Sequence, residues 1–132
     1  MSDLDNIKER AINAINEDTS KSINSGFEYE IKGDLLHFSY DVYDQINYAD
    51  VCNVLESIPN TEITWHGYTL DGNRVELVFN NKDFLDLYYH GALISKSNKI
   101  QQGNRRKKEI RKCTSYQQIK KLLIKWKIDN DI

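Results

Sequence analysis

The amino-acid sequence predicts an α+β fold, a single domain over residues 1–132 with the element order α-ββ-α-ββ-α-α. Apolar residues recur every three to four positions near both ends of the chain, which is typical of amphipathic helices. Between these regions, two stretches alternate apolar and polar residues around a glycine-containing turn, which indicates antiparallel hairpins. The length of 132 residues suits one domain with one core.

The first helix is predicted from Asp3 to about Asn24. Ser2 or Asp3 suits its N-cap, since short polar side chains accept hydrogen bonds from the free amides of the first turn. Gly26 is expected to stop the chain after it, because glycine accepts left-handed backbone angles. The predicted apolar face contains Leu4, Ile7, Ala11, Ala14 and Ile15.

The first hairpin is predicted between residues 27 and 38. Phe27, Tyr29 and Ile31 alternate with charged residues, which is the two-residue period of a half-exposed strand. Gly33-Asp34 is predicted as its tight turn, and residues 35–38 as the returning strand.

The second helix is predicted to begin after Ser39 or Asp41 and to end at Pro59. Its apolar side is expected to contain Val42, Ile46, Ala49 and Leu55. The tyrosines around its start are expected to expose a polar edge; they are Tyr40, Tyr43 and Tyr48.

The second hairpin is predicted around Asp71-Gly72, which is a strong turn signal. Its inward residues are expected to be Ile63, Trp65 and Gly67 before the turn and Val75, Leu77 and Phe79 after it. Asn80 or Asn81 then suits the N-cap of a third helix. The apolar stripe of that helix contains Phe84, Leu85, Tyr88 and Ala92.

The C-terminal part is predicted to form a helical hairpin. Residues at about 95–112 are interpreted as a solvated basic helical arm, with a loop around Gly103-Asn104 as the alternative. Ser115 and Gln118 have the spacing of a capping box, so they are expected to open the last helix. Its apolar residues are Tyr116, Ile119, Leu123 and Trp126.

The charge of the chain is divided unevenly. Its net charge is −2, but residues 1–90 carry 6 Lys and Arg against 17 Asp and Glu, whereas residues 91–132 carry 12 against 3. An acidic body with a basic tail indicates a nucleic-acid patch, a charged protein partner, or attraction between the two halves.

Catalytic and metal-binding signatures are missing from the sequence. The three histidines and two cysteines are scattered, so we expect no metal site. Cys52 lies among apolar residues and is interpreted as a small buried side chain. No nucleophile elbow, phosphate loop or zinc-protease motif occurs, so we expect no enzyme and no cofactor. No apolar run reaches the roughly 18 residues of a membrane helix, and the polar N-terminus predicts no signal peptide.

Two groups of residues are candidates for partner binding. The first is basic: Arg105, Arg106, Lys107, Lys108, Arg111 and Lys112. Its charge suits phosphates, but no aromatic residue that could stack on a base lies between Tyr89 and Tyr116, so nucleic acid is the less favoured partner. The second group is aromatic: Trp65, Tyr68, Tyr88 and Tyr89. Tyr and Trp are enriched at interfaces, although core packing is the more frequent role for such a set.

The order of short motifs resembles a known domain. These motifs are Ile23-Asn24-Ser25-Gly26-Phe27-Glu28-Tyr29, Phe38-Ser39-Tyr40-Asp41, Asp44-Gln45-Ile46-Asn47, Ile63-Thr64-Trp65, Asp71-Gly72-Asn73, Val75-Glu76-Leu77, Phe84-Leu85 and Cys113-Thr114-Ser115. Together they cover about residues 7–123. The chain thereby resembles the uncharacterised domain that recurs in bacteriophage tail-fibre, baseplate and tail-fibre-assembly proteins. The resemblance implies a structural or assembly role and supplies no catalytic residues.

Two functional hypotheses follow from the sequence. The first is a non-enzymatic component of a phage tail or phage-derived particle, docking to a tail-fibre, baseplate or tail-tip protein. A fibre chaperone is a version of it, so the expected location is the virion tail, or the host cytoplasm during assembly. The second is a phage-encoded inhibitor that binds a host protein or nucleic acid through its charged surfaces.

Overall fold

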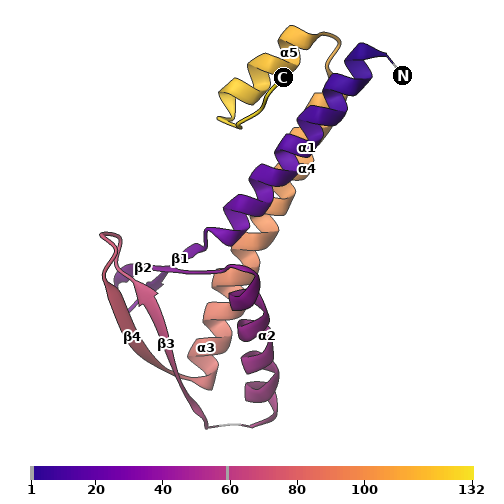
Figure 1. Cartoon of the computed structure of the whole chain (residues 1–132). Coiled ribbons are helices and arrows are strands. Elements are labelled where there is room, and N and C mark those ends of the chain that lie inside the picture. Colours follow the sequence, from indigo (N-terminus) through magenta and orange to yellow (C-terminus); the bar gives the residue numbers. More distant parts are fainter. Residues whose placement is uncertain (1, 59) are drawn as a thin grey trace. The chain divides into compact units, whose positions relative to one another are not determined.

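The computed structural model describes residues 2–58 and 60–132. Its elements are α1 (Asp3–Asn24), β1 (Phe27–Ile31), β2 (Asp34–Phe38), α2 (Val42–Ser57), β3 (Glu62–Tyr68), β4 (Arg74–Asn80), α3 (Asn81–Asp86), the π-helix η1 (Leu87–Leu93), α4 (Ile94–Lys112) and α5 (Tyr116–Lys125) (Figure 1). The predicted α+β class with two antiparallel hairpins is confirmed. The chain divides into two compact units, which are described in turn: unit 1 contains residues 2–22 and 98–132, and unit 2 contains residues 23–97.

Unit 2 contains a four-stranded antiparallel sheet in the order β1-β2-β3-β4. Its two hairpins are joined at His37 and Tyr68, which pair across β2 and β3. The turn of the first hairpin lies at Lys32 and Gly33, so the predicted turn at Gly33-Asp34 is wrong by one residue. Lys32 and Gly33 both have positive φ angles, as the two central residues of a type I′ turn require. Asp34 lies in the returning strand, where it pairs with Ile31.

The core of unit 2 is aromatic, and Tyr48 lies at its centre. The Tyr48 ring lies 4.8 Å from Trp65, 5.6 Å from Phe84 and 5.9 Å from Tyr88, measured between ring centroids. The Trp65 indole N–H donates a 3.1 Å hydrogen bond to the Tyr48 hydroxyl. Such a bond allows a tyrosine to be buried without leaving its polar atom unsatisfied.

The prediction that the tyrosines near the start of α2 expose a polar edge is therefore wrong for two of the three. Tyr40 and Tyr48 are 3% and 0% exposed, and the Tyr40 ring packs edge-on against Phe27. Only Tyr43 follows the expectation, at 78% exposed. Tyrosine combines an apolar ring with a polar hydroxyl, and at these two positions burial of the ring determines where the side chain lies.

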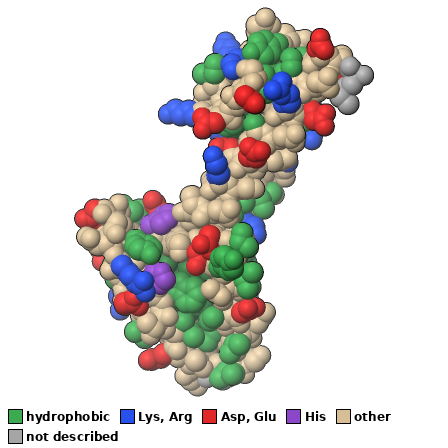
Figure 2. All heavy atoms as spheres, in the orientation of Figure 1, with side chains coloured by type: hydrophobic (Ala, Val, Ile, Leu, Met, Phe, Trp, Pro, Cys, Tyr) green, Lys and Arg blue, Asp and Glu red, His purple; other side chains and the backbone are tan. Residues whose placement is uncertain are grey.

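Helix α2 begins at a capping box formed by Asp41 and Asp44. Its predicted apolar side is partly wrong, because Val42 and Ile46 are exposed. Figure 2 shows hydrophobic side chains on this face of the molecule. The buried side instead contains Tyr48, Cys52 and Leu55. This side packs into the aromatic core, so the aromatic anchor at position 48 sets the orientation of the helix. The predicted end at Pro59 lies outside the described residues.

Buried Cys52 makes the stability of unit 2 depend on pH. Burial, and secondarily the Glu56 carboxylate, raise the pKa of the Cys52 thiol from 9.0 to about 11. Because the pKa is higher in the folded state, this stabilising contribution is complete below pH 9 and is lost as the pH rises from 9 toward 11. We expect the free energy of unfolding to fall by at most about 1.4 kcal/mol per pH unit in that range.

Urea unfolding between pH 8 and about pH 10 measures this fall. Because unfolded tyrosines, with a pKa of about 10, begin to ionise in the same range, the part due to Cys52 is the difference between the unmodified chain and Cys52→Ala. Cys52→Ala is expected to flatten it. A slope that is unchanged in Cys52→Ala would show that another group is responsible.

The segment from Asn81 to Lys112 is helical throughout. Asn80 caps it by accepting a 2.8 Å hydrogen bond from the Asp83 amide. The π-helical turn η1 contains Gly91, which faces β1 so closely that an added Cβ would lie 2.9 Å from the Phe27 ring and 3.1 Å from the Tyr29 ring. The predicted helix at about 95–112 is confirmed, and the alternative loop around Gly103-Asn104 is wrong.

Unit 1 is built from parts of α1 and α4, together with α5. Its core contains Ala11, Ile15, Ile110, Cys113, Ile119, Leu123 and Ile128. Helices α1 and α4 lie side by side (Figure 1). They are in close contact at Gly103, where an added Cβ would lie 2.6 Å from the Thr19 hydroxyl oxygen. Ser2 caps α1 through the Asp5 amide at 3.1 Å. The predicted C-terminal helices are confirmed as α4 and α5, which are joined through residues 113–115. Ser115 caps α5 as predicted, accepting a 3.3 Å hydrogen bond from the Gln118 amide.

Candidate docking surface

The predicted aromatic candidates all lie in unit 2. Trp65 and Tyr88 are half-buried and pack against Tyr48, so their main contacts are within the core. Tyr68 is half-buried and lies edge-on to His66, with 5.7 Å between ring centroids. These contacts match the core-packing interpretation of the set.

Tyr89 is the exposed member of the aromatic set. Its hydroxyl donates a hydrogen bond to the Glu56 carboxylate on α2. This hydrogen bond is the main reason that the pKa of Tyr89 is raised to about 12. The Tyr89 hydroxyl is therefore protonated at neutral pH and fixes a contact between two elements of unit 2.

The basic residues from Arg105 to Lys112 lie on α4 in unit 1 and have two different roles. Arg106 lies 3.8 Å from the Asp18 carboxylate, and Lys107 donates a 2.9 Å hydrogen bond to the Asn16 side chain, so both engage α1. The other four point to solvent, and no ion pair is found for them among residues 2–58 and 60–132; they are Arg105, Lys108, Arg111 and Lys112. The helical period explains the separation, because residues 106 and 107 face the neighbouring helix.

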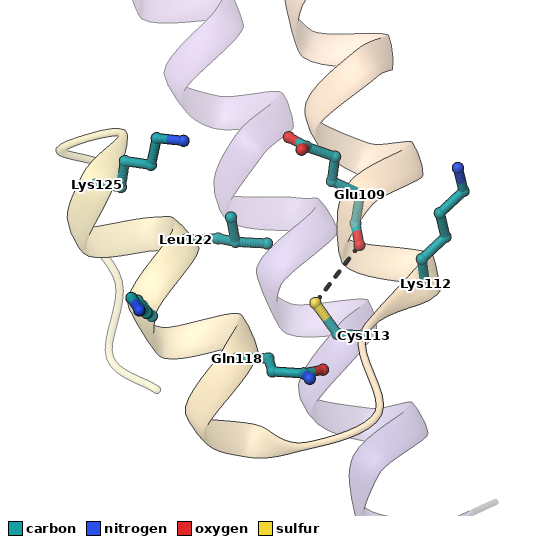
Figure 3. A pocket seen from close by; sticks show the side chains of 7 residues that line it. Glu109, Lys112, Cys113, Gln118, Leu122 and Lys125 are labelled. Carbon is teal, nitrogen blue, oxygen red and sulfur yellow. Dashed lines mark hydrogen bonds between the residues drawn. The ribbon is translucent and has the colours of Figure 1, made fainter.

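An open groove of about 540 Å³ lies between the end of α4 and α5. Leu122 and Gln118 extend into it from α5, and Glu109 extends toward it from α4 (Figure 3). The surface that faces the groove is mostly apolar. Its lining residues are Glu109, Lys112, Cys113, Gln118, Lys121, Leu122 and Lys125.

The chemistry of this groove favours binding over catalysis. The Cys113 thiol is 7% exposed and donates a 3.4 Å hydrogen bond to the Glu109 carbonyl oxygen. Burial raises its pKa, with the Lys8 ammonium opposing and Glu109 adding to the rise. A protonated, buried thiol is a poor nucleophile, so Cys113 acts as part of an apolar floor. The lysines contribute aliphatic stems to the wall and hold their ammonium groups in water.

A second groove of about 480 Å³ continues along α4 and shares Glu109 and Lys112 with the first. Its remaining lining residues are Gln102, Arg105, Arg106, Lys108 and Trp126. The Arg106 guanidinium lies over the Trp126 ring, 5.2 Å from its centroid. We call the two adjoining grooves together the basic groove.

The basic groove includes residues that the sequence reasoning did not select. Lys121, Leu122 and Lys125 lie on α5, and Trp126 is its C-cap. No aromatic residue lies between Tyr89 and Tyr116 in the sequence, yet the fold brings Trp126 beside the basic residues of α4. A sequence pattern that indicates this surface is present in residues 120–126. Lysines recur four residues apart there, and so do apolar residues, which is the spacing of one helix face.

Other site types find little support in the described part of the chain. Residues 2–58 and 60–132 contain no group of three or more His, Cys, Asp or Glu side chains placed to hold a metal ion. Within the same ranges, every helix is too short or too polar to cross a membrane.

Comparison with known proteins returns no relative: no family model, curated protein or solved structure matches the chain. Its function is therefore inferred from the basic groove itself.

Proposed function

We propose that the chain is a non-enzymatic docking protein that binds a protein partner through unit 1. The single observation that supports this function is the basic groove, where an apolar floor lies beside exposed cations that have no ion pair within the described residues. Together with the motif resemblance, it supports a structural or assembly role in a phage tail or phage-derived particle. The partner would be a tail-fibre, baseplate or tail-tip protein.

The two features of the groove would contribute in different ways. Burial of apolar side chains against Leu122 and Cys113 would supply most of the affinity, because desolvated apolar anchors dominate protein interfaces. The surrounding cations would steer the encounter and fix orientation, because exposed charges change association rates more than affinity. Binding of this kind needs no reactive group.

Nucleic acid is the second candidate partner. Exposed Arg105 and Lys108 suit phosphates, and Trp126 offers an aromatic ring on the same surface. However, the apolar groove between α4 and α5 has no counterpart in a phosphate backbone. A protein side chain fills such a space, so a protein partner is favoured.

Site-specific photo-crosslinking tests this proposal. A photoreactive amino acid placed at Lys108 is expected to form a discrete covalent adduct with a protein when the chain is produced in its native host. The matched control places the same group at Asn13, an exposed position on α1 of unit 1 that does not line the basic groove. Mass spectrometry identifies the adduct.

Three further results decide the outcome. The Lys108 adduct should disappear when Leu122→Ala is introduced, and recovery from purified particles would distinguish a resident component from a chaperone. Adducts with nucleic acid alone, or the same protein adducts from Asn13 and Lys108, would contradict the proposal.

A further inference from the structure

We propose that the basic groove binds an acidic amphipathic helix of the partner. This inference rests on the proposed docking function and names the kind of segment that the groove accepts. Apolar side chains of that helix lie between α4 and α5 against Leu122 and Cys113, and the flanking carboxylates of the helix face the lysines of the rim.

The shape of the groove suits a helix. Its walls come from two helices, α4 and α5, joined through residues 113–115. Leu122 extends across the space between them (Figure 3). Apolar channels between two helices accept the apolar face of a third helix, whose anchors recur at three- and four-residue steps. The volume of about 540 Å³ accommodates more than one such anchor.

The charge of the rim selects an acidic partner. Lys112, Lys121 and Lys125 surround the first part of the basic groove, and Glu109 is its one lining carboxylate. Lys121 and Lys125 are four residues apart on α5, so they follow one another along the groove at about 6 Å. Carboxylates spaced four residues apart on a partner helix repeat with the same step.

Both features must be satisfied by the same ligand. An inorganic anion or a nucleic-acid backbone meets the lysines and leaves Leu122 in contact with water. A neutral apolar helix covers Leu122 but leaves the lysine ammonium groups of the rim without a carboxylate partner. An acidic amphipathic helix satisfies the floor and the rim together.

Fluorescence anisotropy with the full chain provides the test. The probe is a labelled designed helix with leucines at i, i+3/i+4 and i+7 and glutamates on the flanks. The same peptide with glutamine in place of glutamate, and a version with a central proline, are the comparison ligands. We expect each comparison peptide to bind at least about tenfold more weakly than the acidic helix. A short DNA duplex is added as a competitor and is expected not to displace the peptide.

Matched variants locate the binding. Lys121→Glu and Leu122→Ala are expected to weaken binding by about tenfold each, because they remove a rim charge and the apolar floor. The controls make the same changes at positions that do not line the basic groove: Lys21→Glu on α1 and Ile124→Ala on α5, where Ile124 is 65% exposed. We expect both controls to stay within about twofold of the unmodified chain. Circular dichroism and tryptophan fluorescence verify that each variant is folded.

The possible outcomes separate this inference from the proposed function. Equal weakening by Lys21→Glu and Lys121→Glu indicates general charge attraction and overturns the inference, as does displacement by DNA. If the peptide fails to bind while Lys108 still crosslinks to a protein, the inference that the partner segment is an acidic helix is wrong, and the proposed docking function stands. If Lys108 forms no protein adduct, the docking function itself fails, whatever the peptide does.

Discussion

Replacing Phe84 by alanine is expected to lower the free energy of unfolding of unit 2 by about 3–5 kcal/mol. The Phe84 side chain is fully buried, and its ring lies 5.0 Å from Trp65, 5.6 Å from Tyr48 and 5.8 Å from Phe79. Removing the ring loses the free energy gained by transferring it out of water. It also leaves a cavity, which the surrounding rigid rings fill poorly, and this cavity adds to the cost.

The two tryptophans allow this effect to be measured in one unit at a time, since Trp65 belongs to unit 2 and Trp126 to unit 1. In a Trp126→Phe background, Trp65 fluorescence follows the urea unfolding of unit 2. Val78→Ala on β4 is the control, because Val78 is exposed, and we expect it to cost less than about 1 kcal/mol. A Phe84→Ala effect as small as that of Val78→Ala would contradict the aromatic core described above.

Replacing Leu123 by alanine is expected to lower the free energy of unfolding of unit 1 by about 2–5 kcal/mol. Leu123 is fully buried in the core of that unit, together with Ile110 and Ile119. Because α5 contributes one wall of the basic groove, loosening its attachment also disturbs the binding surface. Leu123→Ala is therefore expected to weaken acidic-peptide binding even though Leu123 does not line the groove.

Trp126 fluorescence in a Trp65→Phe background follows the unfolding of unit 1, and anisotropy follows peptide binding. Ile124→Ala is the neighbouring control, since the Ile124 side chain is exposed. Peptide binding that survives unchanged in a clearly destabilised Leu123→Ala chain would show that the placement of α5 does not matter for docking.

The sequence was a good guide to the elements and a poorer guide to their orientation. Periodicity and capping residues predict α1, both hairpins and α5, because these signals are local, whereas the apolar pattern fades after Ile94 and leaves a loop around Gly103-Asn104 open as an alternative to α4. The turn at Lys32 was missed because a lysine with a positive φ angle leaves no trace in an apolar pattern. The burial of Tyr48 is not visible in a local pattern, because its hydroxyl accepts a hydrogen bond from Trp65, 17 residues away, and its ring packs on Phe84 and Tyr88.

The docking surface was only partly predictable for a related reason. The basic run on α4 is visible in the sequence, but Arg106 and Lys107 engage residues of α1, so counting charges overstates what is free to bind. The apolar floor depends on Leu122 of α5 and Cys113, which line the same groove once the connection through residues 113–115 returns the chain. A groove between two helices is a tertiary feature, and patterns read one helix at a time do not contain it.

Hydrogen exchange of the full chain, alone and bound to the protein captured from Lys108, tests the central claim most directly. Docking through the basic groove predicts slower amide exchange on binding in the last turns of α4 and along α5, with the amides of β1–β4 unchanged. Slowed exchange confined to unit 2, with α4 and α5 unaffected, would contradict the assignment of the docking surface to unit 1.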